Sequence, residues 1–294
     1  MFDRTLHNWS LIIGSLSFIG SIILAVFLKH PHFYTIFAGG SWLIFDYLNW
    51  RWNKKSLLAY FLSRKRHKLF FGFFILATFF CFLVDYLYGV KLARMWDWVD
   101  YHWYHYLEMY LFMNAFYILS MHELFSLIYS RLALVLSDRN LFHWQVNSRT
   151  QRKIYQLLVL CGVLFLLSPL YSFFLKTEYL LEYVMILPFL GMLFIADGFS
   201  GLLGGKLILA DIIKVNFLKI LSFILTVIVA ASATEALNLF AHEWVYLKMP
   251  FQSVQILGVP VAVFIGWLPL VVGVIAVINF IKNFERVRFK KNIF

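Results

Sequence analysis

Two acidic residues are the strongest candidates for catalysis. Each is followed along the chain by a three-residue motif that begins with tryptophan. Asp85 precedes Trp96-Asp97-Trp98, and Glu235 precedes Trp244-Val245-Tyr246. An apolar, aromatic pocket disfavours the charged form of a carboxyl group, so the group can deliver a proton to a non-polar substrate, while indole and phenol faces stabilise a developing cation. The pattern predicts Asp85 and Glu235 as catalytic acid/base groups. The substrate-binding residues predicted beside them are Trp96, Trp98, Trp244 and Tyr246.

The same residues also have a purely structural interpretation. Each acid would hydrogen-bond a Trp indole or a neighbouring backbone group, because a polar group in an apolar setting needs a partner. Asp85 and Glu235 would then tie their helices to the loops that follow. The sequence leaves the catalytic and the structural interpretations open.

A further acidic residue has a histidine beside it. Glu123 and His122 lie inside an apolar run, and the positions aligned with them in the second half of the chain are Val272 and Gly273. Because the pair breaks the symmetry of the chain, it indicates one active half, with Glu123 as catalytic acid or base and His122 as its partner. The alternative is a polar turn near the end of the run, since Arg131 follows about two turns later.

Matching residues recur at an interval of about 151 positions, which indicates an internal repeat. The matched sets are Asp46, Lys55 and Lys68 in the first half and Asp197, Lys206 and Lys219 in the second. Asp46 and Asp197 form a second candidate site, for substrate binding. At about 1.5 Å of rise per helical residue, this site lies more than about 15 Å from the Asp85 and Glu235 site.

The elements that must position these residues are membrane-spanning helices. Hydrophobic residues make up 62% of the chain and charged residues 14%, and the mean hydropathy is +0.77, unlike soluble globular proteins. Apolar runs long enough to cross the roughly 30 Å hydrocarbon core lie near 9–28, 33–50, 69–88, 105–129, 155–176, 181–205, 217–238 and 254–281. The sequence therefore predicts an all-α integral membrane protein with eight transmembrane helices, arranged as two parallel four-helix repeats.

Basic residues gather between the runs and predict the organisation of the chain. The expected parts are a first four-helix repeat at 1–130, a basic cytoplasmic linker at 131–154 and a second repeat with a basic tail at 155–294. By the positive-inside rule both termini are cytoplasmic, and we expect a multi-pass protein of the bacterial cytoplasmic (inner) membrane. The net charge of +11 comes from these clusters, so the expected partners are membrane lipids and not nucleic acid.

The sequence predicts neither a metal site nor a cofactor. Cys81 and Cys161 lie in apolar runs and lack the spacing of a disulfide, zinc or haem motif. His102 and His105 are three positions apart, but nothing elsewhere supplies an obvious third ligand. The chain also has no nucleophile elbow, no HExxH and no P-loop.

Several motifs resemble an uncharacterised family of duplicated polytopic bacterial membrane proteins. They are Asp46-Tyr47-Leu48-Asn49, Lys55-Ser56-Leu57-Leu58, the acid before each Trp-x-Tyr/Trp step, and Gly266-Trp267-Leu268-Pro269. That resemblance covers most of the chain and implies no activity. A looser one is to the small membrane lycopene cyclases and carotenoid hydratases, whose repeats carry an acid, a W-x-Y-like step and a later Pro-x-Glu-Glu. The later positions here are Leu119 and Glu123, and Pro269 and Gly273, so this resemblance implies architecture more than a reaction.

Three kinds of function are compatible with the sequence. The first is binding or conversion of a lipid or isoprenoid-type hydrophobic small molecule by intramembrane acid/base chemistry. The second is a membrane transporter, because parallel repeats place substrate sites at their interface. The third is a non-catalytic membrane scaffold whose linker and tail contact a partner. The oligomeric state is not predicted.

Overall fold

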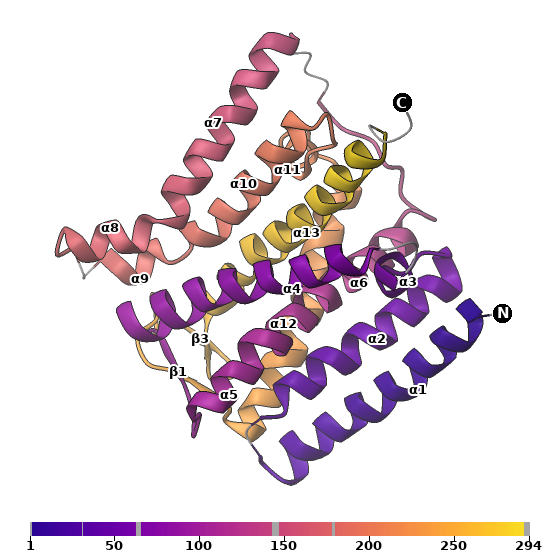
Figure 1. Ribbon diagram of the computed structural model, residues 1–294. Coiled ribbons are helices and arrows are strands. Elements are labelled where there is room, and N and C mark those ends of the chain that lie inside the picture. The colour runs from indigo at the N-terminus through magenta and orange to yellow at the C-terminus, as the bar shows by residue number, and fades with distance from the viewer. Residues whose placement is uncertain (1, 31, 63–65, 143–146, 178–179, 291–294) are drawn as a thin grey trace. The chain divides into compact units, whose positions relative to one another are not determined.

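The computed structural model describes residues 2–30, 32–62, 66–142, 147–177 and 180–290, and most of them are helical (Figure 1). The first α-helices are α1 (Phe2–Ile22), α2 (Tyr34–Asn53), α3 (Leu57–Leu62), α4 (His67–Cys81), α5 (Trp103–Glu108) and α6 (Asn114–Leu132). The π-helical stretches are η1 (Ile23–Phe27), η2 (Phe82–Leu92) and η3 (Met109–Met113).

The remaining elements follow the linker, apart from one strand. The helices are α7 (Ser148–Leu166), α8 (Ser168–Phe174), α9 (Leu181–Val184), α10 (Leu187–Leu202), α11 (Ile208–Ile213), α12 (Phe217–Ala241) and α13 (Val261–Lys290). The strands are β1 (Trp96–Trp98), β2 (Trp244–Tyr246), β3 (Gln255–Ile256) and β4 (Val259–Pro260). The predicted helical class is confirmed.

Six helices within the described residues are long and apolar enough to cross a membrane. They are Arg4–Phe27, His67–Leu92, Trp103–Leu132, Leu181–Leu202, Phe217–Ala241 and Val261–Val287. A seventh span results if Ser148–Leu166 and Ser168–Phe174 are counted together; they are bent by 46° at a break just before Pro169, which cannot donate a helical hydrogen bond. The chain therefore has the helices of a multi-pass membrane protein.

The predicted span at 33–50 is a helix, α2, but it is less apolar than those six. Asp46, Asn49 and Arg51 lie in it, and these polar residues lower its mean hydropathy. The count of eight spans therefore stays a prediction.

The chain divides into two compact units. Unit 1 contains Met1–Ser130, Ile228–Met249 and Leu257–Val259, and unit 2 contains Arg131–Val227, Pro250–Ile256 and Pro260–Phe294. Helix α12 begins in unit 2 and ends in unit 1.

In unit 1, α1 and α2 lie side by side, and glycines set how closely they approach (Figure 1). A Cβ atom at Gly40 would lie 2.7 Å from the backbone nitrogen of Phe18 and 3.0 Å from the carbonyl oxygen of Gly14. A Cβ atom at Gly14 would lie 2.9 Å from Cβ of Leu43. Small residues of this kind let helix backbones pack tightly inside membranes.

In unit 2, α7 and α10 make the corresponding close contact. A Cβ atom at Gly191 would lie 2.7 Å from the carbonyl oxygen of Gly162 and 2.8 Å from the backbone nitrogen of Leu166. Helix α10 also packs against α13, where a Cβ atom at Gly273 would lie 2.6 Å from Cε of Met192.

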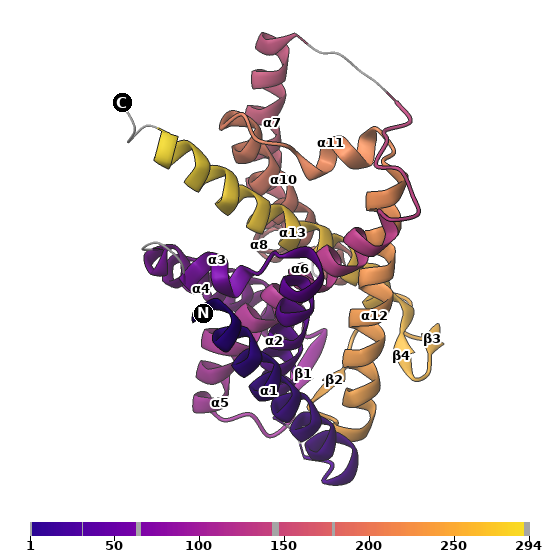
Figure 2. The same ribbon diagram turned by 90° about the vertical axis from the view of Figure 1, so that its right-hand side faces the viewer.

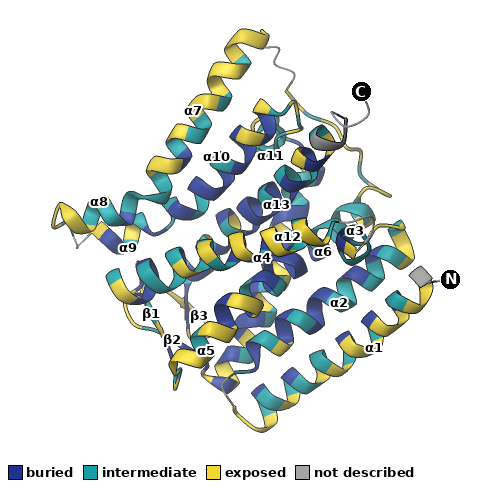
Figure 3. Ribbon diagram, viewed as in Figure 1, coloured by how far each residue is buried: buried dark blue, intermediate teal, exposed yellow. Residues whose placement is uncertain are grey.

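Several helices expose large apolar residues, and exposed positions are yellow in Figure 3. Leu16 of α1, Ile75 of α4 and Leu157 of α7 are 67%, 71% and 57% exposed. Soluble monomers rarely expose apolar surface on this scale, whereas helices that face lipid require it. The exposure agrees with the membrane assignment.

A short antiparallel ribbon is formed by β1 and β2, which are far apart in the sequence and side by side in unit 1 (Figure 2). Trp96 pairs with Tyr246, Asp97 with Val245, and Trp98 with Trp244. The two three-residue motifs that begin with tryptophan are therefore paired in one ribbon.

The glycine contact in unit 2 predicts a specific stability loss. Gly191→Ala would force α7 and α10 apart, so we expect it to lower the free energy of unfolding by about 1–3 kcal/mol, as overpacking does. The control is Gly266→Ala in α13, where a Cβ atom would meet nothing within 4 Å and alanine favours the helix. Thermal unfolding in one detergent compares the two; equal melting temperatures would contradict the prediction.

Candidate functional site

Asp85 is surrounded by aromatic hydrogen-bond donors. Trp96 Nε1 donates to its Oδ1 at 2.8 Å, and its Oδ2 accepts from Trp98 Nε1 at 3.2 Å and from the Tyr110 hydroxyl at 2.6 Å. Three donors aimed at one carboxyl group favour its ionised, acceptor-only form. Asp85 therefore fixes the directions of three rings from β1 and from the η3 segment.

Local sequence explains how Trp96 reaches Asp85. The acid lies in the π-helical stretch η2, a type of irregularity that is frequent at functional sites. One turn later stands Gly89, where a Cβ atom would lie 2.1 Å from Cζ2 of Trp96. Only a residue without a side chain leaves room for the indole there.

Glu235 has a similar arrangement at the end of α12. Its Oε1 accepts a hydrogen bond from the Tyr246 hydroxyl at 2.8 Å, and that hydroxyl accepts one from Trp244 Nε1 at 3.0 Å. The amide of Asn238 holds the backbone of Trp244 through two hydrogen bonds, of 2.9 and 3.1 Å. A phenol thus stands between Glu235 and the indole.

Both acids lie on the same face of the ribbon. Residues two apart in a strand share a face, and so do directly paired residues. Trp96, Trp98, Trp244 and Tyr246 therefore point to one side, and the ring centroids of Trp98 and Trp244 are 5.5 Å apart. The structure brings all six residues predicted for this site together in unit 1. It also shows the hydrogen bonds that the structural interpretation expects.

A third carboxyl group, Glu243, was not recognised in the sequence. Its side chain is fully buried; Oε2 accepts from the backbone nitrogen of Tyr34 at 3.0 Å, and Oε1 accepts from the Tyr101 hydroxyl. Burial raises the pKa of Glu243 to about 7, against the lowering effect of these donors. The available signal was an acidic residue directly before Trp244.

Rings pack closely beside Glu243. The ring of Trp244 is stacked on that of Phe33, with centroids 6.1 Å apart, and its centroid lies 5.2 Å from that of Tyr34. The ring centroids of Trp98 and Tyr101 are also 5.2 Å apart. Burial and the nearby Glu243 raise the pKa of Tyr101 far above its ordinary value. The hydroxyl therefore stays protonated and donates a hydrogen bond to Glu243. We call the three carboxyl groups and the rings around them the carboxylate–aromatic cluster. Its members are Asp85, Glu235, Glu243, Phe33, Tyr34, Trp96, Trp98, Tyr101, Tyr110, Trp244 and Tyr246.

The predicted inner site has a different geometry. Asp46 accepts hydrogen bonds from the Ser56 hydroxyl at 2.7 Å and the backbone nitrogen of Leu58 at 2.9 Å, and it lies 3.7 Å from Nδ1 of His7. It therefore holds the first turn of α3. Ser56 donates to the acid and not to a histidine, so these residues do not form a nucleophilic triad.

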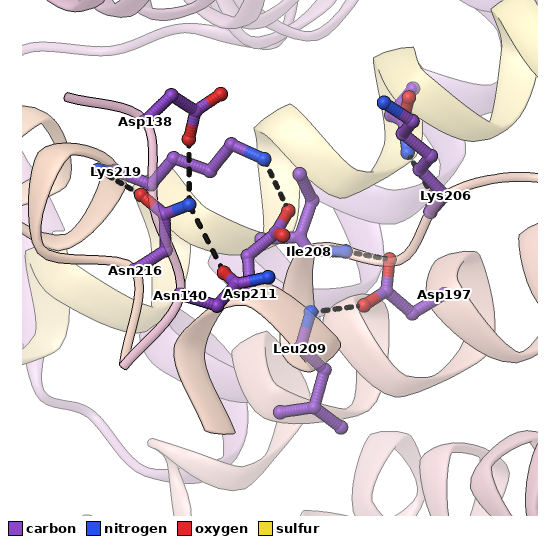
Figure 4. A network of polar contacts seen from close by, with 10 residues as sticks. Asp138, Asn140, Asp197, Lys206, Ile208, Leu209, Asp211, Asn216 and Lys219 are labelled. Carbon is purple, nitrogen blue, oxygen red and sulfur yellow. Dashed lines mark hydrogen bonds and ion pairs between the residues drawn. The ribbon is translucent and has the colours of Figure 1, made fainter. Parts of the chain in front are cut away.

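Asp197 holds the first turn of α11 in unit 2. It accepts hydrogen bonds from the backbone nitrogens of Ile208, at 3.1 Å, and Leu209 (Figure 4). A neighbouring network fixes the linker: Asn216 donates to Asp138 and Asn140, and Lys219 pairs with Asp211 (Figure 4). Asp46 belongs to unit 1 and Asp197 to unit 2.

Glu123 belongs to α6 in unit 1, and its buried side chain lies beside the end of α2. It accepts hydrogen bonds from the side chain of Asn49 and from the backbone nitrogen of Leu57, at 2.9 Å. Glu123 and Asp46 thus share the first turn of α3. The preceding residue, His122, is only partly buried, and adjacent helical residues do not share a face.

Among the described residues, no group of three or more His, Cys, Asp or Glu side chains is placed to hold a metal ion. Comparison of the chain with family models, with curated proteins and with solved structures found no match. The function is therefore inferred from the geometry of the site.

The three donors to Asp85 predict a large effect of Asp85→Asn. The NH2 group of the new asparagine would point its N–H donors at the donors of the surrounding rings. We therefore expect a loss of about 2–4 kcal/mol in the free energy of unfolding. The matched control is Asp97→Asn on the same ribbon, since Asp97 is exposed and accepts only from the Trp98 backbone nitrogen among the contacts described. Chemical unfolding followed by tryptophan fluorescence measures both, and an equal effect of the two substitutions would refute the assignment.

Burial of Glu243 predicts a pH dependence of stability. Its pKa is about 7 in the folded protein against 4.5 ordinarily, so the folded state binds this proton more tightly. The resulting stabilisation is fully present below pH 4.5 and is lost as the pH rises through 7, by about 3 kcal/mol. Glu243→Gln cannot titrate, so the variant should gain stability relative to the native protein between pH 5 and pH 8. A constant difference in unfolding free energy across that range would contradict this.

Proposed function

We propose that this multi-pass membrane protein binds a hydrophobic small molecule of lipid or isoprenoid type at the carboxylate–aromatic cluster of unit 1, and acts on it by acid/base chemistry. The observation that carries the proposal is the convergence of three carboxyl groups on one set of rings. Aromatic faces bind apolar molecules and stabilise developing positive charge. Buried carboxyl groups can give a proton to a bound apolar molecule or take one from it.

The three carboxyl groups would have different roles. Asp85 accepts three hydrogen bonds, so it is best suited to remain ionised and act as a positioning residue for Trp96 and Trp98. Glu243 has a pKa of about 7, which suits a group that gives and takes a proton near neutral pH. Glu235, beside the Tyr246 hydroxyl, is the second candidate for proton transfer.

We further propose that the chain is a duplicated eight-span protein with parallel repeats. Two observations support this. Asp46 accepts from Leu58 and Asp197 from Leu209, which is the same spacing of 12 residues. The glycine contact between α1 and α2 also has a counterpart between α7 and α10. Cytoplasmic termini and a bacterial inner-membrane location remain part of the proposal.

Under this duplication, the counterpart of Glu123 is Asn279 and not Gly273. Glu123 lies at the turn after α2, whereas Gly273 lies beside Phe189 and Met192, near the beginning of α10. Asn279 donates to the carbonyl oxygen of Lys206, in the turn after α10, at 2.7 Å. The second half has a longer segment before its last helix, which shifts the alignment by about six residues.

A transporter is the second candidate, and the buried pair of His7 and Asp46 favours it. Both side chains are fully buried and 3.7 Å apart, and ionisable pairs inside spans often mark ion pathways. Single cysteines placed along α2, in a chain whose Cys81 and Cys161 are replaced by alanine, would be treated with a membrane-impermeant thiol reagent. Protection from both sides of the membrane would exclude this pathway.

The proposed function predicts a bound molecule and its dependence on two residues. Protein extracted gently from its membrane should carry a hydrophobic species other than bulk phospholipid, detected by mass spectrometry of an organic extract. Glu243→Gln and Glu235→Gln should change the amount or the chemical state of that species, because they remove the proton and keep the shape.

Asp97→Asn is the matched control on the same ribbon, and it should leave the species unchanged. Recovery of bulk phospholipid alone from the native protein would argue against the proposal. Unchanged content in a Glu235→Gln, Glu243→Gln double variant that keeps the native melting temperature would do the same.

A further inference from the structure

Four histidines from two segments of unit 1 meet next to the carboxylate–aromatic cluster. The ring centroids of His32 and His105 are 3.9 Å apart, those of His30 and His32 are 5.8 Å apart, and those of His102 and His105 are 5.7 Å apart. His30 and His32 come from the connection between α1 and α2. His102 and His105 come from the beginning of α5.

The contacts require neutral rings. Nδ1 of His105 accepts a hydrogen bond from the backbone nitrogen of His102 at 3.1 Å, so that nitrogen carries no proton in this arrangement. A proton added there would break the bond that closes the first turn of α5. Protons on both His32 and His105 would also place two like charges on rings whose centroids are 3.9 Å apart.

The surroundings of His32 resist its protonation. Burial, as the largest cause, and the nearby His105, His30 and His102 together lower the pKa of His32 to about 4, while Asp100 acts in the opposite direction. His32 also has a backbone φ of 76°, a left-handed value that is uncommon for a residue other than glycine. The ring of His32 is in contact with those of His30, Tyr101 and His105.

One side chain joins this histidine group to the buried acid. The ring of Tyr101 lies 4.8 Å from His32 and 5.5 Å from His105, and its hydroxyl donates to Glu243. Glu108 and Asp85 are the other acidic groups whose charges act on Tyr101. Glu243 in turn accepts the backbone N–H of Tyr34, in the first turn of α2. A displacement of His32 or His105 would thus move a ring that is bonded to Glu243.

We propose that His30, His32, His102 and His105 form an acid-sensitive contact that controls the Tyr101–Glu243 hydrogen bond, and with it the proton exchange of the cluster. As regulation of that cluster, the inference rests on the function proposed above, but the structural coupling needs no bound molecule. At neutral pH the uncharged rings hold Tyr101 against Glu243. As the pH falls from 6.5 towards 4, protonation favours separated rings, and the bond is released.

Hydrogen exchange followed by mass spectrometry tests the coupling in nanodiscs at pH 7.5 and pH 5.5, with times corrected for intrinsic exchange. The peptides to follow carry the amides at the beginning of α2 and of α5. In the native protein we expect the protection of the α5 amides to fall on the order of tenfold at pH 5.5. At the α2 amides the proton taken up by Glu243 opposes this fall. His32→Phe keeps a ring against His105 and cannot take up a proton, so it should remove most of that fall.

Three further variants separate the possible outcomes. His105→Asn keeps an acceptor for the His102 N–H without a titrating ring, and serves if His32→Phe does not fold. His67→Phe, on α4, should retain the native response. Glu243→Gln removes the proposed proton exchange but should leave the acid response of the α5 peptide, so failure of the function and failure of the contact give different results. Equal protection of the α5 amides at both pH values in the native protein, or a full response in both His32→Phe and His105→Asn, would overturn the proposal.

Discussion

The structure depends on one constraint: a carboxyl group in an apolar interior must be met by hydrogen-bond donors, because an unpaired buried charge is very unfavourable. Asp46, Asp85 and Asp197 all satisfy it in the same way. Each takes a donor that lies 11 or 12 residues later in the chain, supplied by the segment that follows its helix. These acids therefore determine how a helix connects to the next element. The backbone amides at α3 and α11 and the indole of Trp96 are arranged around them.

This dependence explains which parts of the site were predictable from sequence. Asp85 and Trp96, like Glu235 and Tyr246, are 11 residues apart, so their pairing leaves a local pattern that can be read in both halves. Glu243 leaves no such pattern, because its donor on α2 lies 209 residues away. Tyr110, 25 residues after Asp85, was missed for the same reason. Spacing reveals contacts along one connection, but contacts between distant segments require the fold.

Helices that consist mainly of apolar residues were predictable from the sequence. Helices whose polar residues contact buried partners were less predictable. Apolar runs gave the positions of the six long helices, whereas α2 carries polar residues because Asp46 and Asn49 face buried partners and not lipid. The break before Pro169 also interrupts a run whose composition is continuous.

The carboxylate–aromatic cluster combines rigidity and response because its acids have different donors. Asp85 is held by three side chains, and it fixes the directions of their rings. Glu243 is held partly by Tyr101, a ring that also touches His32 and Trp98. A change at the histidines therefore reaches a buried carboxyl group through a single side chain. Such a coupling needs direct contact at each step and no long pathway through the protein.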